Sequence, residues 1–179
     1  MRVDSATGLL IGIKQVLCPF FDERPAGVEP DLIVLHGISL PPGEFGGPWV
    51  SRLFTGSLPP AAHPFFAEVA ALRVSAHLFL RRDGEIVQFV SFRHRAWHAG
   101  RSSWQGREAC NDYSIGIECE GSDDVSYADA QYAALRELLP KLLAAYPAIT
   151  PDRIVGHSDV APGRKTDPGP SFDWSRVRS

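Results

Sequence analysis

An apolar run that ends in a histidine constrains the fold of this chain more than any other segment. Residues 31–36 read Asp-Leu-Ile-Val-Leu-His, which has the length of a strand and lacks the polar alternation of a half-solvated one. Strands that are buried on both faces have this pattern, and they occur in sheets covered by helices. The run therefore predicts a sheet in an α/β or α+β fold, with His36 at the carboxyl end of one strand.

Strands and helices alternate loosely along the rest of the chain. Strands are expected at residues 31–36, 75–80, 85–90, 112–121 and 153–156, and helices at residues 49–53, 64–72 and 129–146. The pair at 75–80 and 85–90 is predicted to form a hairpin, because Asp83-Gly84 between them is a preferred turn sequence. The helix at 129–146 should face the core, since its apolar side chains recur at spacings of three and four. A length of 179 residues predicts one domain, residues 1–179.

Charge and cysteine content exclude several classes of partner. The formal net charge is −3 and the basic residues are scattered, which argues against binding of a nucleic acid. No run is long and apolar enough to span a membrane, and the first residues lack the pattern of a secretory signal. The three cysteines, an odd number at unrelated spacings, favour a reducing compartment. We therefore expect a cytoplasmic protein, and nothing in the sequence indicates an obligate protein partner.

Two loops rich in glycine and proline follow predicted strands. Residues 37–48 form a long segment unsuited to helix or strand, and such loops are often functional. Residues 157–170 carry an imidazole, an ammonium and a carboxylate from His157, Lys165 and Asp167. Because proline restricts the backbone and glycine permits unusual turns, this loop can hold its side chains in one arrangement.

His36, His157 and Asp167 together have the composition of a catalytic zinc site, in which three protein ligands leave a fourth position for water. If the strands that end at the two histidines are parallel neighbours, both imidazoles project at one sheet edge, where open α/β sheets bind ligands. The spacing matches no short zinc signature, however. A structural, hydrogen-bonded role for each histidine remains the alternative at this point.

Two further charged residues fit hydrolysis at such a site. Glu118 shares one face of its strand with Glu120, and a carboxylate near the metal could act as general base and acid. Lys165, on the same loop as two proposed ligands, could stabilise the oxyanion that forms when an amide carbonyl is attacked. The alternatives are an ion pair between Glu118 and an arginine such as Arg73, Arg101 or Arg107, and a solvated Lys165.

Six motifs in order along most of the chain resemble the AmpD family of N-acetylmuramoyl-L-alanine amidases, within the wider amidase and peptidoglycan-recognition-protein fold. They are residues 35–47 (LHGISLPPGEFGG), 73–77 (RVSAH), 82–88 (RDGEIVQ), 95–100 (RAWHAG), 110–118 (CNDYSIGIE) and 156–169 (GHSDVAPGRKTDPG). The resemblance implies a central mixed β-sheet flanked by helices, with a zinc groove at the edge of the sheet. It also implies cleavage of the amide between the lactyl group of 1,6-anhydro-N-acetylmuramic acid and L-alanine of a stem peptide, in cytoplasmic peptidoglycan recycling.

The same resemblance assigns roles to individual residues. It implies that His36, His157 and Asp167 hold Zn²⁺, that Glu118 is the general base and acid, and that Lys165 stabilises the transition state. The substrate would be a muropeptide. Two competing hypotheses are a non-catalytic peptidoglycan-binding module and an amidase that acts on intact cell wall; the presence of all five residues and the lack of an export signal weigh against them.

Substrate-binding residues are harder to assign because the chain departs from the family pattern. It has Gly37 where members often carry asparagine, and Ala109 where they carry an arginine that helps to hold stem-peptide carboxylates. Arg73 and Arg107 are candidates to replace that arginine, since guanidinium pairs with carboxylate bidentately. Trp97 and His98 lie in a motif that the family places beside the substrate, and they are further candidates, although a core position is an equal alternative for Trp97.

Overall fold

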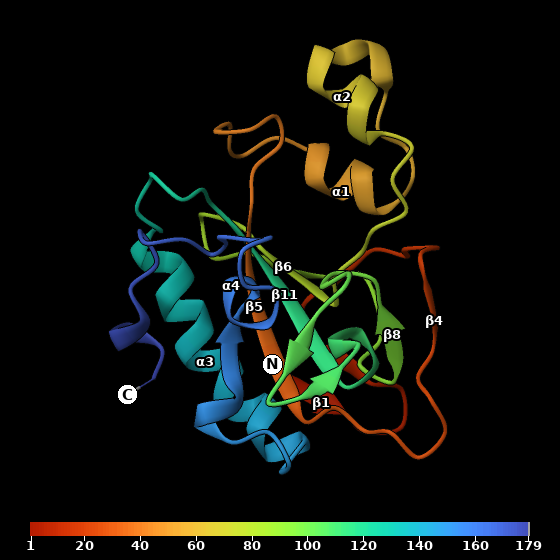
Figure 1. Cartoon of the computed structure of the whole chain (residues 1–179), viewed down its shortest axis with the longest axis vertical. Coiled ribbons are helices and arrows are strands. Elements are labelled where there is room, and N and C mark those ends of the chain that lie inside the picture. Colours follow the sequence, from red (N-terminus) through yellow and green to blue (C-terminus); the bar gives the residue numbers. More distant parts are fainter. Residues whose placement is uncertain (179) are drawn as a thin grey trace.

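A six-stranded sheet organises the chain in this computed structural model, which describes residues 1–178 (Figure 1). In spatial order its strands are β12 (Ile154–Gly156), β5 (Leu32–Ile38), β11 (Ser114–Glu120), β6 (Leu78–Leu80), β7 (Ile86–Gln88) and β3 (Lys14–Gln15). The first four are parallel neighbours, β6 and β7 pair antiparallel, and β7 and β3 pair parallel. The sheet is therefore mixed, which confirms the predicted fold class.

Strand β5 is buried on both faces, as its apolar run predicted. Ile33 and Leu35 pack in the core cluster that contains the apolar side of helix α3 (Asp129–Ala145). Leu32 and Val34 point the other way, into a cluster with Tyr113. Figure 1 shows α3 lying along one side of the sheet. The alternation of side chains along a strand explains how one run of four apolar residues serves two cores.

The remaining elements are short. Three further strand pairs are β1 (Arg2–Asp4) with β2 (Leu9–Ile11), β4 (Phe21–Glu23) with β8 (His94–Ala96), and β9 (Ser103–Trp104) with β10 (Arg107–Glu108). The other α-helices are α1 (Trp49–Phe54), α2 (Pro64–Val69) and α4 (His157–Val160), and the 3-10 turns are Pro60–Ala62, η2 (Cys110–Asp112), Pro151–Arg153 and Trp174–Arg176. Within residues 1–178 we find no helix that is long and apolar enough to cross a membrane.

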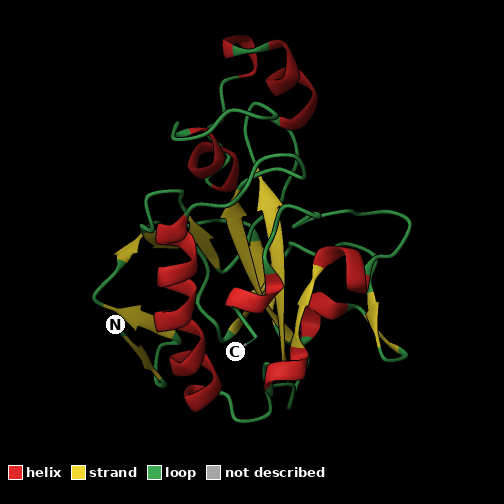
Figure 2. Ribbon diagram, turned by 90° about the vertical axis from the view of Figure 1, so that its left-hand side faces the viewer, coloured by secondary structure: helices red, strands yellow, loops and turns green. Residues whose placement is uncertain are grey.

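The segment that carries α1 and α2 projects beyond the carboxyl end of β5 in both views (Figures 1 and 2). The glycine- and proline-rich loop at 39–48 leads from the sheet to this segment, and Glu120 anchors it. The Glu120 carboxylate, only 2% exposed, accepts hydrogen bonds from the backbone N–H groups of Gly46 (2.6 Å) and Arg82 (3.0 Å). The second carboxylate on the face of β11 is therefore a structural clamp for the loop.

The predicted elements differ from the structure mainly at their ends. The hairpin forms with Asp83-Gly84 at its turn, but its paired strands are shorter than predicted, and α2 ends at Val69 instead of residue 72. His157 begins a single helical turn, α4, where a loop was expected. This turn forms because the Asp159 carboxylate accepts a hydrogen bond from the backbone N–H of Gly156 (2.8 Å), which caps it.

Candidate metal centre

Strand register brings the two predicted histidine ligands together. Strands β5 and β12 are parallel, and Gly156 pairs with Leu35, so His36 and His157 leave the sheet side by side. Their Nδ1 atoms lie 2.9 Å apart. Asp167 reaches back from the loop beyond α4 and places its Oδ2 atom 3.2 Å from Nδ1 of His36 and 3.0 Å from Nδ1 of His157. Three potential ligand atoms from segments far apart in sequence therefore converge on one point.

The donor set fits a tetrahedral zinc ion. Zinc binds imidazole nitrogen and carboxylate oxygen at about 2.0 Å, so two ligand atoms of a tetrahedral site lie roughly 3.3 Å apart. The three distances observed here, 2.9 to 3.2 Å, are close to that value. The second nitrogen of His157, Nε2, donates its hydrogen to the backbone carbonyl of Ala99 (3.1 Å). The Nδ1 atom of the neutral ring therefore has no hydrogen, and its lone pair faces the cluster.

The protonation states also suit a cation. Burial lowers the pKa of His36 to about 4, although its hydrogen bond with Asp167 opposes this shift, so the imidazole is neutral near pH 7. Burial disfavours ionisation of Asp167, but its close contacts with the imidazoles of His157 and His36 outweigh this effect and lower the pKa of the carboxyl group below its usual range. A neutral imidazole and an ionised carboxylate are the forms in which these groups bind metals.

Glu118 lies beside the three ligand atoms. It is directly opposite His36 in the register of β11 and β5, and its Oε1 atom is 3.9 Å from His36 Nδ1. Its side chain is 12% exposed, and among the described residues its buried Oε2 atom has no hydrogen-bond partner. Burial raises the pKa of Glu118 well above its ordinary value, the charge of Asp167 adds to the shift, and that of Lys165 opposes it. This carboxyl group therefore binds a proton more readily than an exposed one.

Lys165 is exposed on the same loop as Asp167. Its charge contributes to lowering the pKa of both Glu118 and His36, so the ammonium group is electrostatically coupled to the centre. Its backbone N–H donates to the carbonyl of Ala161 (3.1 Å), which fixes the start of the side chain. The cluster thus has an exposed positive charge close to it.

The structure distributes the four predicted substrate-binding residues differently. Arg73 is exposed, and Trp97 is half-buried with its indole N–H donated to Asp22 (3.0 Å). The Arg107 guanidinium pairs with Asp31 (2.7 Å) and lies 3.6 Å from the centre of the Tyr113 ring, so structural contacts occupy it. His98 is 9% exposed and lies behind His36, with its Nδ1 atom 2.9 Å from His36 Nε2. A position behind a ligand suits support of that ligand better than contact with substrate.

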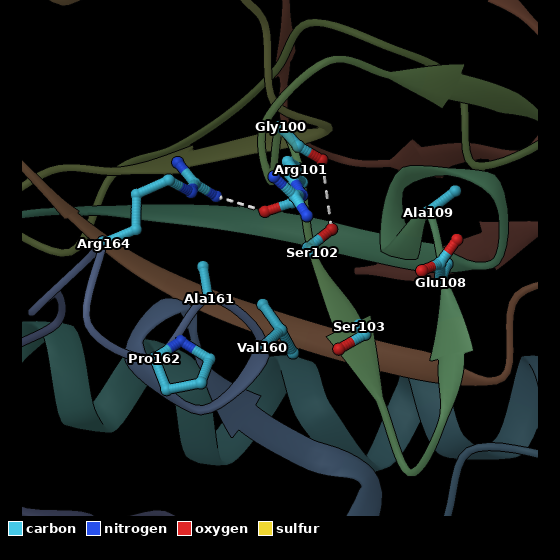
Figure 3. A pocket seen from close by; sticks show the side chains of 10 residues that line it. All are labelled: Gly100, Arg101, Ser102, Ser103, Glu108, Ala109, Val160, Ala161, Pro162 and Arg164. Carbon is cyan, nitrogen blue, oxygen red and sulfur yellow. Dashed lines mark hydrogen bonds between the residues drawn. The ribbon is translucent and has the colours of Figure 1, made fainter.

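A pocket with two arginines lies between the segment at residues 100–109 and the residues from Val160 to Arg164 (Figure 3). Its volume is about 520 Å³, and its lining includes Arg101, Arg164, Glu108 and Ala109. Arg164 donates through Nη2 to the carbonyl oxygens of Ala99 and Arg101, both at 2.7 Å. Ala99 O is also the acceptor of His157 Nε2, so one carbonyl group contacts both Arg164 of the pocket and His157 of the cluster.

From the sequence, Arg101 was a candidate only as an ion-pair partner for Glu118, and no role was predicted for Arg164. Within residues 1–178 we find no hydrogen bond or ion pair made by the guanidinium of Arg101, which is exposed. Arg101 directly follows Gly100, the last residue of the RAWHAG segment, and this position was the only sequence signal for a role at the site. Local sequence could not show that this residue and Arg164 line the same pocket.

Comparison with known proteins gives consistent matches. Residues 26–170 match the N-acetylmuramoyl-L-alanine amidase family. The chain is 60% identical over 171 residues to 1,6-anhydro-N-acetylmuramyl-L-alanine amidase AmpD of Escherichia coli K12, covering 96% of this chain and 93% of that protein. A crystal structure of a selenomethionine derivative of AmpD superposes with a TM-score of 0.95 at 58% identity, covering 99% of this chain and 98% of the other.

A more distant structure contains a substrate. It is the complex of the amidase AmiD of Escherichia coli with anhydro-N-acetylmuramic acid-L-Ala-D-γ-Glu-L-Lys, which is similar to this chain with a TM-score of 0.61 at 28% identity. The similarity covers 88% of this chain and 64% of AmiD. The peptide of that ligand is linked through the γ-carboxyl group of glutamate, so its α-carboxyl group is free.

Proposed function

The chain belongs to the AmpD family of N-acetylmuramoyl-L-alanine amidases, and from that premise we propose that it is a zinc-dependent enzyme of peptidoglycan recycling. The bond to be hydrolysed joins the lactyl group of 1,6-anhydro-N-acetylmuramic acid to L-alanine of the stem peptide. This proposal includes a single amidase domain over residues 1–179 and a cytoplasmic location. The three cysteines, which are buried and free, are compatible with a reducing compartment.

One observation carries the proposal: a carboxylate oxygen that has no hydrogen-bond partner within residues 1–178 lies beside a convergent set of proposed zinc ligands. His36, His157 and Asp167 would hold the ion, and when bound it would supply Lewis-acid polarisation and lower the pKa of a water molecule. Glu118 would take a proton at its free Oε2 atom as water attacks the amide carbonyl carbon. Its raised pKa suits this role, because a general base works best when its pKa lies near the working pH.

Transfer of this proton from Glu118 to the leaving group would complete the reaction. As the carbon–nitrogen bond breaks, Glu118 would return the proton to the departing amine nitrogen of L-alanine, and the lactyl group would leave as a carboxylate. The ammonium group of Lys165 would stabilise the negative charge that develops on the carbonyl oxygen. No further co-reactant is required, since water supplies both the oxygen and the protons.

The arginine pocket would hold the peptide part of the substrate. Arg101 and Arg164 give its lining two positive charges against the single negative charge of Glu108, so it favours a carboxylate. A free carboxylate, such as that of a γ-linked glutamate, lies only one residue beyond the alanine of the scissile bond in the AmiD ligand. Arg73, Trp97 and Arg107 remain predictions as substrate-binding residues, but the contacts of Trp97 and Arg107 within the protein make Arg101 a better candidate.

The alternatives from other classes are less well supported. A non-catalytic binding module has no need of a buried carboxyl oxygen that finds no hydrogen-bond partner in the described part of the chain, beside three proposed metal ligands, and such a group costs free energy. An amidase that acts on intact cell wall would meet long glycan strands outside the cytoplasm, which disagrees with the proposed cytoplasmic location. One experiment distinguishes both alternatives from the proposed function.

That experiment combines metal analysis with a cleavage assay. Protein purified without chelator should contain about one zinc per chain, and it should release peptide from 1,6-anhydromuropeptide, detected by mass spectrometry. Intact ligand after long incubation with zinc-loaded protein would contradict the enzyme and favour the binding module. Equal rates on anhydro and non-anhydro muropeptides would contradict the recycling role and favour intact wall as substrate.

A further inference from the structure

One short segment lies behind both imidazole ligands. The residues are His98 and Ala99, which follow β8 and precede β9. Nε2 of His36 lies 2.9 Å from Nδ1 of His98, and Nε2 of His157 lies 3.1 Å from the carbonyl oxygen of Ala99. The outward nitrogen of each imidazole therefore meets one of two consecutive residues.

A single amide side chain holds this segment in place. The Oδ1 atom of Asn111 accepts hydrogen bonds from the backbone N–H groups of His98 (3.2 Å) and Ala99 (2.8 Å). Asn111 lies in the turn η2, and it is only 7% exposed. Because both bonds end on the same oxygen atom, a shift of Asn111 would move the supports of both histidines together.

The ring of His98 has little freedom to rearrange. Its Nε2 atom lies 3.2 Å from Oγ of Ser114, and its plane meets that of His36 at 85° with 4.9 Å between the ring centres. A side chain at Gly116 would overlap the ring of His98, so the absence of a Cβ atom there creates the space that the ring fills. Dense packing of this kind fixes a side chain in one orientation.

The hydrogen bonds allow one arrangement of protons when His36 binds a cation through Nδ1. His36 must then carry its proton on Nε2 and donate it to Nδ1 of His98. His98 in turn carries its proton on Nε2 and donates it to the hydroxyl oxygen of Ser114. His157, which donates from Nε2 to Ala99, has the same tautomer as His36.

We propose that Asn111 and the His98-Ala99 segment form a positioning unit that holds both imidazole ligands with Nδ1 free for zinc, an inference that rests on the zinc site of the proposed function. Metal-bound histidines usually donate their second N–H to a carboxylate, a carbonyl or water, and such partners raise metal affinity. Here one partner is a carbonyl and the other is a third histidine. His98 thus acts through His36 and is not itself a ligand.

Two substitutions of His98 separate positioning from packing. His98→Phe keeps an aromatic ring but removes the acceptor, whereas His98→Asn offers Oδ1 at the position of Nδ1. In competition with a chromophoric chelator, we expect zinc to dissociate about 10- to 100-fold more readily from the phenylalanine variant, and the asparagine variant to stay much closer to wild type. Equal affinity of the phenylalanine variant and wild type, with only the melting temperature of the zinc-free protein lowered, would overturn the proposal.

Asn111 gives an independent pair, because Asn111→Asp retains the Oδ1 acceptor and Asn111→Leu removes it. The leucine variant should lose zinc affinity in the same range as His98→Phe, and the aspartate variant should lose less. A leucine variant that binds zinc as tightly as the aspartate variant would contradict the role of Asn111.

Wild-type protein provides a test that does not depend on the folding of a variant. In the zinc-loaded protein, long-range ¹H–¹⁵N NMR correlations should place a proton on Nε2 of His36, His98 and His157. A deprotonated Nε2 on His36 would overturn the proposal. Failure of wild-type protein to bind zinc would instead refute the proposed function, so the two failures can be told apart.

Discussion

Glu118 stands directly opposite His36 in the parallel pairing of β11 with β5, and their side chains approach to 3.9 Å. Residues paired in neighbouring strands point to the same face of a sheet, so this register alone puts a carboxyl group next to an imidazole that we propose as a metal ligand. One residue of slippage would turn Glu118 away into the core. The proposed proton-transfer group and the proposed metal ligand therefore lie on adjacent strands.

Replacement of Glu118 by glutamine should abolish catalysis and leave the zinc site intact. Glutamine has the same shape but cannot accept the proton, so kcat should fall at least about 100-fold while zinc content stays near that of wild type. Steady-state kinetics and metal analysis measure the two effects. His157→Ala is the matched comparison, since it should lose both zinc and activity; equal loss of zinc in the two variants would refute the division of roles.

Removal of Arg101 should weaken substrate binding with little effect on the chemical step. Its guanidinium makes no hydrogen bond or ion pair within residues 1–178, so Arg101→Ala should fold normally while KM rises about tenfold and kcat stays constant. Arg136→Ala removes the same charge from the exposed side of α3 and serves as control.

Two modified substrates identify the carboxylate that Arg101 contacts. One carries an amide in place of the α-carboxyl group of the γ-linked glutamate, and the other has an amidated C-terminus. Wild type should lose affinity for only one of them, and Arg101→Ala should no longer distinguish that substrate from the unmodified one. An unchanged KM for Arg101→Ala on all three substrates would exclude the contact.

The zinc-free protein should lose stability as the pH falls below about 6.5, in part through His77. Burial, with the nearby charge of Arg24, holds the pKa of His77 well below 6.5, so the unfolded chain binds a proton there that the folded chain does not. The free energy of unfolding therefore decreases towards lower pH. In His77→Asn, which keeps an acceptor for the N–H of Gly116, the slope should be smaller by up to about 1.4 kcal/mol per pH unit. Identical slopes in urea titrations between pH 5 and 7.5 would disprove this contribution.

Glu120→Gln should loosen the loop at residues 39–48 and spare the zinc site. Both oxygen atoms of Glu120 accept backbone N–H groups, and an amide would present a donor to one of them. Hydrogen exchange of Gly46 should become faster, while zinc affinity stays within about threefold of wild type because the ligands lie on other segments. Unchanged exchange at Gly46 would show that Arg81, which donates to the carbonyl of Gly46 (2.8 Å), suffices to hold the loop.

Local patterns in the sequence predicted much of the fold. The apolar run before His36, the Asp83-Gly84 turn and the periodic helix at 129–146 each depend on neighbours in the chain, and the structure confirms all three. The ends of elements were less accurate, because hydrogen bonds such as that from Gly156 to Asp159 decide where a helix begins.

Residue types and motifs in the sequence by themselves determined the donor set, the catalytic candidates and the family, because those depend on chemistry that each side chain carries anywhere. Only the tertiary structure decided which other residues contact these side chains. His36 and His98 are 62 residues apart, and their contact requires the register of two strands and the missing side chain of Gly116. Likewise Arg107, a plausible carboxylate ligand in sequence, is paired with Asp31, whereas Arg101 is left facing a pocket. Contacts of this kind depend on packing across the whole fold, so local sequence patterns do not predict them.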